Sequence, residues 1–343
     1  MKVTLTTIAE DTGYSVSTVS RVLSNYSKIS SKTRETVLKS ARRLNYPIPY
    51  ENRVDLGRDQ LNFILLTSFH EGEFYASFFC GYLRSIASRR IRLSLLSVAE
   101  PETQTTATIE KLIEEGNCDG IILFMPELDH QHYQELAGVV PDNFPLVSNG
   151  LIENPVFTTI TFDGYSGGYQ AAMHFEELGY QDLGIVKGPS HKPETRFRYN
   201  GFRDYIESRE HLNLVWEYDN GSFEFDSGQP AVADMLTQPR RPQAVFVSND
   251  LMALSFLEAA KASGLLIPDD IALIGYDDLP LCKQVTPNIS TIRTDFQRLG
   301  TESLEALEQM LRRKKKQRGM MSFVPVSLVP RASSVLKLPA EPM

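Results

Sequence analysis

The chain has 343 residues, of which 42% are hydrophobic and 23% are charged, and its net charge is −8. This length exceeds one ordinary domain and this composition can fill a sizeable core, which excludes disordered and fibrous proteins. No apolar run approaches the roughly 18 residues of a membrane-spanning helix, and the N-terminus lacks the apolar stretch of a secretory signal, so a cytoplasmic protein without membrane contacts is expected.

The charge is distributed unevenly along the chain. Residues 1–46 carry eight basic and three acidic side chains, a net charge of +5, so the remaining 297 residues carry −13. A small basic segment on a large acidic body is typical of a polyanion-binding module joined to a domain with another task. A pair of solvated surface helices would give the same charge. The residue pattern of the segment is therefore needed to distinguish it from a polyanion-binding module.

Three short helices are predicted in this segment. We expect Thr6 to cap a helix over residues 7–11, with Glu10 and Asp11 in its first turns, where the helix dipole favours carboxylates. Gly13 is expected to end this helix, and Ser15 to cap a second one over residues 16–23.

The second helix has two distinct faces. Its apolar stripe holds Val19, Val22 and Leu23, and another face holds Val16, Ser17, Ser20 and Arg21. A third helix is predicted from Ser31 to Leu44, with the apolar stripe Val37, Leu38, Ala41 and Leu44. Two short helices joined at a glycine turn and braced by a third are typical of a helix-turn-helix, whose second helix lies in the major groove of DNA.

The stretch Thr7 to Leu23, together with Lys32-Thr-Arg34 and Leu44-Asn-Tyr46, resembles the head of the lac repressor (LacI/GalR) family of bacterial transcription regulators. The resemblance implies that Val16 and Ser17 choose bases, that Ser20 and Arg21 contact phosphate or base, and that Thr18 approaches the backbone. An arginine can pair with guanine O6 and N7, and a valine methyl suits the thymine methyl. The other DNA-binding residues implied in the head are Thr6, Ser15, Lys32 and Arg34.

Residues 47–60 are predicted to be a hinge or linker. The family pattern has a short hinge helix here that inserts a leucine into the minor groove, and Leu56 is the one suitable wedge. Asp55 beside it would face phosphate and Gly57 would end the helix, so a plain flexible linker remains the alternative.

From residue 61 onward, short apolar runs alternate with helical patterns, which predicts parallel sheets covered by helices in a two-lobed α/β body. The predicted strands span residues 62–67, 92–98, 120–124, 145–148, 158–162, 183–187, 214–218, 244–248, 271–276, 290–293 and 323–329. The predicted helices span residues 73–89, 103–115, 166–177, 196–207, 228–236, 250–263 and 296–312.

The resemblance continues over the body, in segments such as Arg198-Tyr-Asn-Gly-Phe202, Ser248-Asn-Asp250 and Gly275-Tyr-Asp-Asp278. It implies a relative of periplasmic sugar-binding proteins, with a small effector held between the lobes at the carboxyl ends of the strands. The implied polar contacts are Arg198, Asn249 and Asp277, the aromatic walls are Phe223 and Phe296, and Ser68 and His70 are the contacts of the first lobe. Asn249 and Asp277 could instead be a helix cap and a loop residue. Ser148-Asn149-Gly150 replaces the family's usual acidic sugar contact, which leaves the identity of the effector open.

One enzymatic alternative is a G-x-S-x-G nucleophile elbow at residues 164–168, in which Ser166 would serve an acyl hydrolase. The last histidine of the chain, His211, lies only 45 residues further on, so no plausible triad follows. His130-Gln-His132 lacks a further metal ligand in register, and Cys80, Cys118 and Cys282 are too widely separated for a metal clip or a disulfide framework. No enzyme activity, cofactor or metal is therefore expected.

These patterns predict an all-α helix-turn-helix head (residues 1–46), a linker (47–60) and an α/β body of the periplasmic-binding type (61–335). The first lobe is expected over about 61–161 and 292–320, and the second over about 162–291 and 321–335. We expect a homodimeric transcription regulator of the bacterial nucleoid, most simply a repressor, that binds a pseudo-palindromic operator in double-stranded DNA. A small sugar or sugar phosphate is expected to modulate its operator affinity, and a sugar-binding protein without a regulatory role is the rival.

Overall fold

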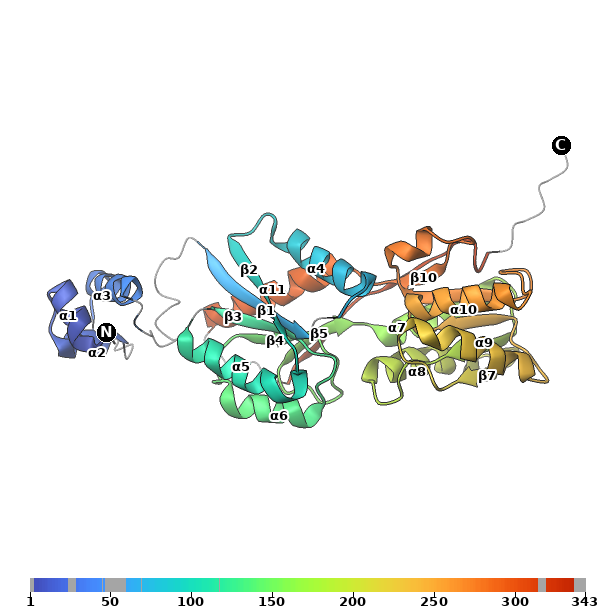
Figure 1. The fold of residues 1–343 in the computed structure, drawn as a ribbon, viewed down its shortest axis with the longest axis horizontal. Coiled ribbons are helices and arrows are strands. Elements are labelled where there is room, and N and C mark those ends of the chain that lie inside the picture. The colour runs from blue at the N-terminus through green and yellow to red at the C-terminus, as the bar shows by residue number, and fades with distance from the viewer. Residues whose placement is uncertain are drawn as a thin grey trace. The chain divides into compact units, whose positions relative to one another are not determined.

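The structure, a computed structural model, describes residues 3–23, 29–44, 46, 60–68, 70–116, 118–313 and 319–335. The chain divides into two units, one with residues 1–70, 83–160 and 300–322, the other with residues 71–82, 161–299 and 323–343. Figure 1 shows the helical N-terminal head and the α/β elements of both units. The predicted linker, including Leu56, lies outside the described residues apart from residue 60.

The head consists of three helices packed around one small core, as predicted. These are α1 (Leu5–Thr12), α2 (Val16–Leu23) and α3 (Ser31–Arg43). The core holds Ile8, Ala9, Val19, Val22, Leu23, Val37, Leu38 and Ala41. Every apolar residue predicted for the stripe of α2 is therefore buried, and the other face of that helix is turned away from the core.

The start of α1 differs from the prediction. The helix begins at Leu5, and Thr4 rather than Thr6 is its N-cap, because the Thr4 and Thr7 side chains form a reciprocal capping box. Glu10 and Asp11 consequently lie in the second half of the helix and not in its first turns, so the predicted dipole interaction is wrong. Asp11 instead accepts hydrogen bonds from Ser40 and Arg43 of α3. Gly13 ends the helix as predicted, with a φ of 73° in the left-handed region.

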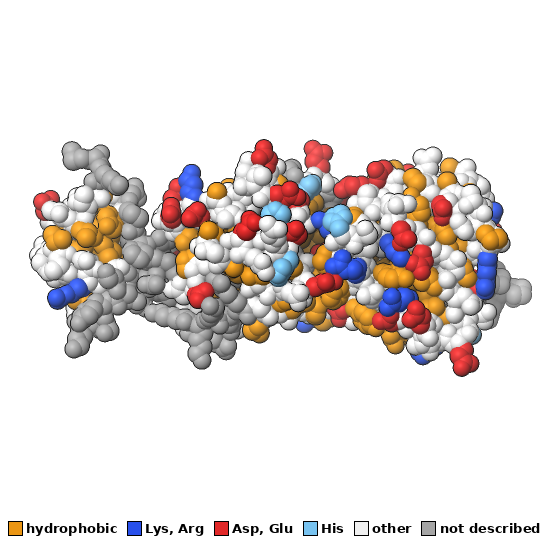
Figure 2. Space-filling model, turned by 90° about the horizontal axis from the view of Figure 1, so that it is seen from below, with side chains coloured by type: hydrophobic (Ala, Val, Ile, Leu, Met, Phe, Trp, Pro, Cys, Tyr) orange, Lys and Arg blue, Asp and Glu red, His pale blue; other side chains and the backbone are white. Residues whose placement is uncertain are grey.

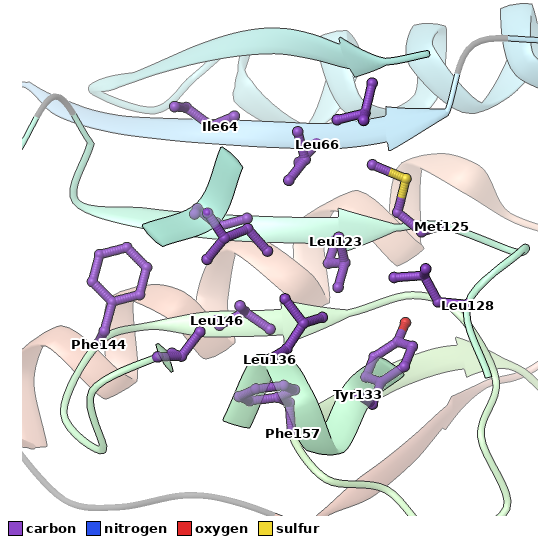
Figure 3. Packing of buried hydrophobic residues seen from close by; sticks show 14 of the residues in the cluster. Ile64, Leu66, Leu123, Met125, Leu128, Tyr133, Leu136, Phe144, Leu146 and Phe157 are labelled. Atoms are coloured by element: carbon purple, nitrogen blue, oxygen red, sulfur yellow. The ribbon is translucent and has the colours of Figure 1, made fainter. Parts of the chain in front are cut away.

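The first α/β unit contains a six-stranded sheet in the order β11-β5-β4-β3-β1-β2. Helices α5 and α6 pack on the face that bears Ile64, Leu66 and Leu123 (Figure 3). The strands are β1 (Leu61–Ser68), β2 (Ile91–Val98), β3 (Gly120–Phe124), β4 (Leu146–Ser148), β5 (Thr158–Phe162) and β11 (Met321–Val324). The helices are α5 (Pro101–Glu115) and α6 (His130–Val139), and α4 (Glu73–Ile86) and α11 (Phe296–Arg313) are each divided between the two units.

The second unit contains another six-stranded sheet, in the order β12-β10-β9-β8-β6-β7. Helices α7 and α8 pack against a core that includes Phe202, Phe246 and Ile274, and α9 and α10 pack against each other and against β7, β8 and β9. The strands are β6 (Asp182–Val186), β7 (Asn213–Tyr218), β8 (Ala244–Val247), β9 (Ala272–Asp277), β10 (Ser290–Arg293) and β12 (Ser327–Val329). The helices are α7 (Gly164–Glu177), α8 (Pro193–Glu207), α9 (Gly228–Thr237) and α10 (Asp250–Ala262), with the 3-10 turns η2 (Phe225–Ser227) and η3 (Pro280–Lys283).

Three features of the body correct the predictions. The single strand predicted over residues 323–329 is two strands, β11 and β12, which belong to different sheets. Pro325 lies at the break, where its missing N–H cannot join a ladder. Strand β12 pairs with β10 in the antiparallel sense, so the second sheet is not wholly parallel. Helix α6 was not among the predicted helices, although Asp129 and His132 cap it reciprocally.

The second unit also takes in residues 71–82 and 292–299, which the prediction placed with the first lobe. Packing accounts for this, because Phe74 and Phe78 at the start of α4 contact the ring of Phe296. The Glu73 carboxylate also accepts a hydrogen bond from the Leu281 N–H at 2.8 Å. Among the described residues, no helix is both long and apolar enough to cross a bilayer.

The two threonines at the start of α1 provide a test of the cap. Thr4→Ala should destabilise the head by about 1 kcal/mol because it removes the capping box, whereas Thr6→Ala should change the stability by only a few tenths. Hydrogen exchange of the α1 and α3 amides in the full-length chain measures both effects. Equal protection in the two variants would contradict the assignment of Thr4 as the cap.

Candidate DNA-reading helix and candidate effector site

Helix α2 presents a small polar and aliphatic surface on the side away from the head's core. The Ser15 hydroxyl caps it by accepting a hydrogen bond from the Thr18 N–H at 3.2 Å. Val16 is 42% exposed, unusual for a valine on a helix whose other large aliphatic residues are buried. Ser17 and Arg21 are exposed, and Thr18 and Ser20 are half-buried. A short helix with an exposed valine, three hydroxyls and a guanidinium has the groups needed to read base edges in the major groove.

The other head residues predicted to contact DNA lie near helix starts. Thr6 is exposed in the first turn of α1. At the start of α3, Lys32 is exposed and Arg34 is half-buried. The Ser30 hydroxyl accepts a hydrogen bond from the Thr33 N–H at 3.1 Å and so fixes the start of α3. N–H groups at helix starts also suit phosphate oxygens.

In the second unit, Arg198 is the centre of a buried polar site. It lies on α8, is only 9% exposed, and its guanidinium carbon is 3.7 Å from the centre of the Tyr276 ring. One terminal nitrogen donates to the carbonyl oxygen of Ser248, and the other lies 4.0 Å from the Asp277 carboxylate. The residues come from α8 and from the carboxyl ends of β8 and β9, the sheet edge at which α/β proteins bind ligands.

Several polar atoms of this site have no hydrogen-bond partner in the described part of the chain. They are the Arg198 Nε, the Tyr276 hydroxyl, one carboxylate oxygen of Asp277 and the Thr195 hydroxyl, all of them buried. Buried polar groups are nearly always paired, and leaving one unpaired costs on the order of 1–3 kcal/mol. Four such atoms on neighbouring residues indicate a site prepared for a polar ligand. Sequence reasoning missed Tyr276 and Thr195, although Tyr276 directly precedes a predicted contact.

Asn249 connects the same site to the loop that carries Phe223. Its side-chain oxygen caps α10 by accepting from the Met252 N–H at 2.9 Å, and its amide donates to the Phe223 carbonyl at 2.7 Å. The alternative helix-cap role is therefore present in the structure. The Phe223 ring lies 5.5 Å from the Arg198 guanidinium carbon, as expected for an aromatic wall.

Backbone strain concentrates at this site. Among the described non-glycine residues, Phe223, Asp277 and Asp278 have positive φ angles, of 69°, 120° and 56°. Such conformations cost of order 1–3 kcal/mol each and persist where the surroundings enforce them, typically at ligand sites. Asp278 is held by Arg293 and Arg331, which both bind its carboxylate.

Two buried carboxyls lie behind the site. Burial raises the pKa of Asp250 to about 6, although Thr291 and the Leu279 N–H donate hydrogen bonds to its carboxylate. Burial also raises the pKa of Asp277 well above its usual value, and the positive charge of Arg198 opposes this shift. The Arg198 guanidinium therefore faces one carboxyl, that of Asp277, which is costly to ionise without further hydrogen-bond donors.

Phe296 has a different environment from the predicted one. It is 8% exposed, and its ring makes edge contacts with Phe74, Phe78 and Phe162. This aromatic cluster covers most of the ring, so its main observed role is packing.

In the first unit, Ser68 and His70 lie together after β1 and share a partner that the sequence did not indicate. The Glu127 carboxylate accepts from the Ser68 hydroxyl at 2.9 Å and contacts the His70 Nε2 at 2.6 Å. Glu127 follows β3, so this unit does carry an acidic residue beyond a strand, at a different strand from the usual family position.

Ser166 has a structural partner rather than a catalytic one. Its hydroxyl donates to Asp163 at 2.6 Å and its N–H donates to the same carboxylate at 2.9 Å, which caps α7. A serine that donates to a helix-capping carboxylate is not activated by a general base of the histidine type. The acyl hydrolase alternative therefore has no support from this geometry.

The raised pKa of Asp250 gives a testable pH dependence. Because the folded-state pKa lies above the unfolded one, this carboxyl contributes stability below about pH 4 that is lost as the pH rises to about 6. The free energy of unfolding of Asp250→Asn relative to the parent should thus rise by about 2 to 3 kcal/mol over this range. Urea unfolding followed through Trp216, the single tryptophan, measures it. If the difference in unfolding free energy between Asp250→Asn and the parent does not change with pH, the raised pKa of Asp250 is contradicted.

Comparison with known proteins gives a separate family match for the head and for the body. Residues 4–48 match the bacterial regulatory proteins of the lacI family, and residues 172–334 match a periplasmic binding protein-like domain. The ribose operon repressor of Escherichia coli is 29% identical over 329 residues, covering 94% of this chain and 97% of that protein. The transcriptional repressor PurR of Haemophilus influenzae is 26% identical over 333 residues, covering 95% and 96%.

A solved structure agrees with both domain matches. The crystal structure of the lac repressor dimer bound to operator and the anti-inducer ONPF has a TM-score of 0.69 and 27% identity, and the match covers 98% of this chain and all of that one. Its similarity extends over the head and the body together. The chain is therefore a DNA-binding transcriptional regulator with a helix-turn-helix head of the lacI family and a periplasmic-binding-type body.

Proposed function

We propose that this regulator is a dimeric repressor whose affinity for a pseudo-palindromic operator is modulated by a small sugar or sugar phosphate. The effector binds at Arg198, Asp277, Tyr276 and Thr195 in the second unit. The observation that carries this proposal is the set of buried polar atoms without partners on these residues. A ligand that forms hydrogen bonds with these atoms would offset the free-energy cost of burying them without partners.

The chemistry of the site suits a carbohydrate. Adjacent ring hydroxyls can accept from the Arg198 Nε and donate to the Asp277 carboxylate, and such charge-assisted hydrogen bonds are the stronger kind. Phe223 and Tyr276 add aromatic surface to the polar groups, the combination typical of small-molecule sites. Ligand hydroxyls that donate to Asp277 would also lower the pKa that burial raises.

The DNA side of the proposal rests on charge and symmetry. The head carries +5 while the rest of the chain carries −13, and Figure 2 shows acidic side chains interspersed with basic ones over the visible face of the body. Phosphate attraction is thereby confined to the head, so only the head adds favourably to nonspecific DNA affinity. Two identical heads related by a dimer axis would read two half-sites of opposite orientation, which makes the operator pseudo-palindromic. Such a regulator acts in the bacterial cytoplasm, where the operator lies.

Effector control requires two conformations of the protein with different affinities for DNA. A ligand shifts their equilibrium only by as much as its own affinities for them differ. The rival function, a sugar-binding protein without regulation, leaves the helix-turn-helix and its exposed reading face without a role.

Arg21 provides the test of the reading helix. Arg21→Ala should weaken operator binding by about 1 to 3 kcal/mol if the guanidinium pairs with a guanine. Lys39→Ala, on the exposed side of α3 in an ion pair with Glu35, is the matched control and should change the affinity less. Fluorescence anisotropy with an operator duplex, selected from promoter DNA by footprinting, measures both. Unchanged affinity in Arg21→Ala would remove this residue from the reading face.

Asp277 provides the test of the effector site. Asp277→Asn should weaken sugar binding about 10- to 100-fold, because a charged acceptor is lost, and should leave operator affinity without ligand unchanged. Asp269→Asn, at an exposed position of the same unit, is the control. Calorimetric titration with a panel of pentoses, hexoses and their phosphates identifies the ligand and measures the loss. A variant that still releases the operator at the parental ligand concentration would refute the role of Asp277.

A further inference from the structure

The glycines at the start of α7 lie against the Arg198 site. The segment Gly164-Tyr-Ser-Gly-Gly168 matched a nucleophile motif, but its serine caps the helix, which leaves the glycines unexplained. Each of these three glycines lies next to Arg198 or Tyr276, or next to a neighbour of one of them.

Gly168 of α7 and Gly201 of α8 bring the two helix backbones into direct contact. A Cβ atom at Gly168 would lie 2.0 Å from the carbonyl oxygen of Arg198, and one at Gly201 would lie 1.9 Å from the carbonyl oxygen of Tyr165. Real Cβ atoms do not approach backbone oxygens so closely, so either substitution has to move one helix. This crossing therefore fixes the position of the Arg198 backbone relative to α7.

Gly164 and Gly167 leave space for the two side chains of the site. A Cβ at Gly164 would lie 3.4 Å from the Arg198 Cγ, and one at Gly167 would lie 2.6 Å from the Tyr276 Cε2. The first two turns of α7 thus form the wall behind both the guanidinium stem and the tyrosine ring. Alanine at 164 is the mild perturbation of this wall, because its contact is only slightly tighter than usual.

We propose that Gly164, Gly167, Gly168 and Gly201 are positioning residues that set the Arg198 guanidinium on the Tyr276 ring with its Nε free for a ligand. The proposal rests on the effector site proposed above. Two independent observations support it, namely the backbone contact at the crossing and the buried Nε without a partner. The glycines act through Arg198 and make no contact with the ligand themselves.

The geometry of Arg198 leaves little tolerance for displacement. Its guanidinium carbon lies 3.7 Å from the ring centre while a terminal nitrogen donates to the Ser248 carbonyl. A helix shift of about 1 Å would lengthen that hydrogen bond beyond its useful range and change the direction of the Nε–H. Because the head has a hydrophobic core of its own, we expect the operator affinity without ligand to stay unchanged while the ligand affinity falls.

The test is Nε–H nuclear magnetic resonance of Arg198 in the full-length protein labelled with ¹⁵N-arginine. Arg198→Lys assigns the resonance, which the Tyr276 ring current should displace from the range of solvated arginines. Gly164→Ala, Gly168→Ala and Gly201→Ala should each move it towards that range. Gly138→Ala is the matched control, because this helical glycine of α6 has open space around its Cα. The proposal is overturned if Gly164→Ala and Gly168→Ala fold and their Arg198 Nε–H resonances keep the position seen in the parent. If Gly168→Ala and Gly201→Ala fail to fold, the resonance of Gly164→Ala alone is the test.

Ligand and operator titrations of the same variants distinguish this proposal from the proposed function. Gly168→Ala should bind the sugar identified for the parent about tenfold more weakly or worse, with unchanged operator affinity in the absence of sugar. Equal sugar affinity in Gly168→Ala and the parent also overturns the positioning role. If the parent binds no sugar of the panel, the proposed effector fails, while the arginine resonance still decides the role of the glycines.

Discussion

The second unit depends on one buried charge that its own chain satisfies only in part. Arg198 lies on the Tyr276 ring, donates to the Ser248 carbonyl and faces a carboxyl whose pKa burial raises, yet its Nε has no partner among the described residues. An uncompensated buried charge is costly, so the surrounding structure has to enforce this arrangement. The arrangement is held in place by helix α8, by the ends of β8 and β9 and by residues 277 and 278, whose backbones are strained.

The head of this regulator and its α/β body differ in charge and in exposed surface. The head has a well-formed core of its own, an exposed reading face on α2 and the positive charge of the chain, while the body is acidic. In the proposed function, DNA binding and the binding of a polar ligand therefore belong to separate parts of one chain. A regulator needs this separation, because a signal is transmitted only when occupancy at one site changes affinity at another.

Elements with strong local signals could be predicted from the sequence, and features set by distant contacts could not. The apolar stripes of α2 and α3, the glycine end of α1 and the alternation of strands and helices follow from short-range patterns and are confirmed. The Thr4 cap was missed because two threonines compete within three residues, and the capping box decides between them. The division of residues 321–329 between two sheets depends on which strand each half meets. Tyr276 and Glu127 join their sites through tertiary packing, which periodicity does not report.

In the proposed function, sugar binding at Arg198 and operator binding at α2 are energetically coupled. Its most direct test is a complete thermodynamic cycle, in which sugar affinity is measured with and without saturating operator DNA, and operator affinity with and without saturating sugar. Linkage requires the two affinity ratios to be equal, and the account predicts a common ratio of about 5 to 150. A parent protein that binds both partners with both ratios equal to one would contradict it.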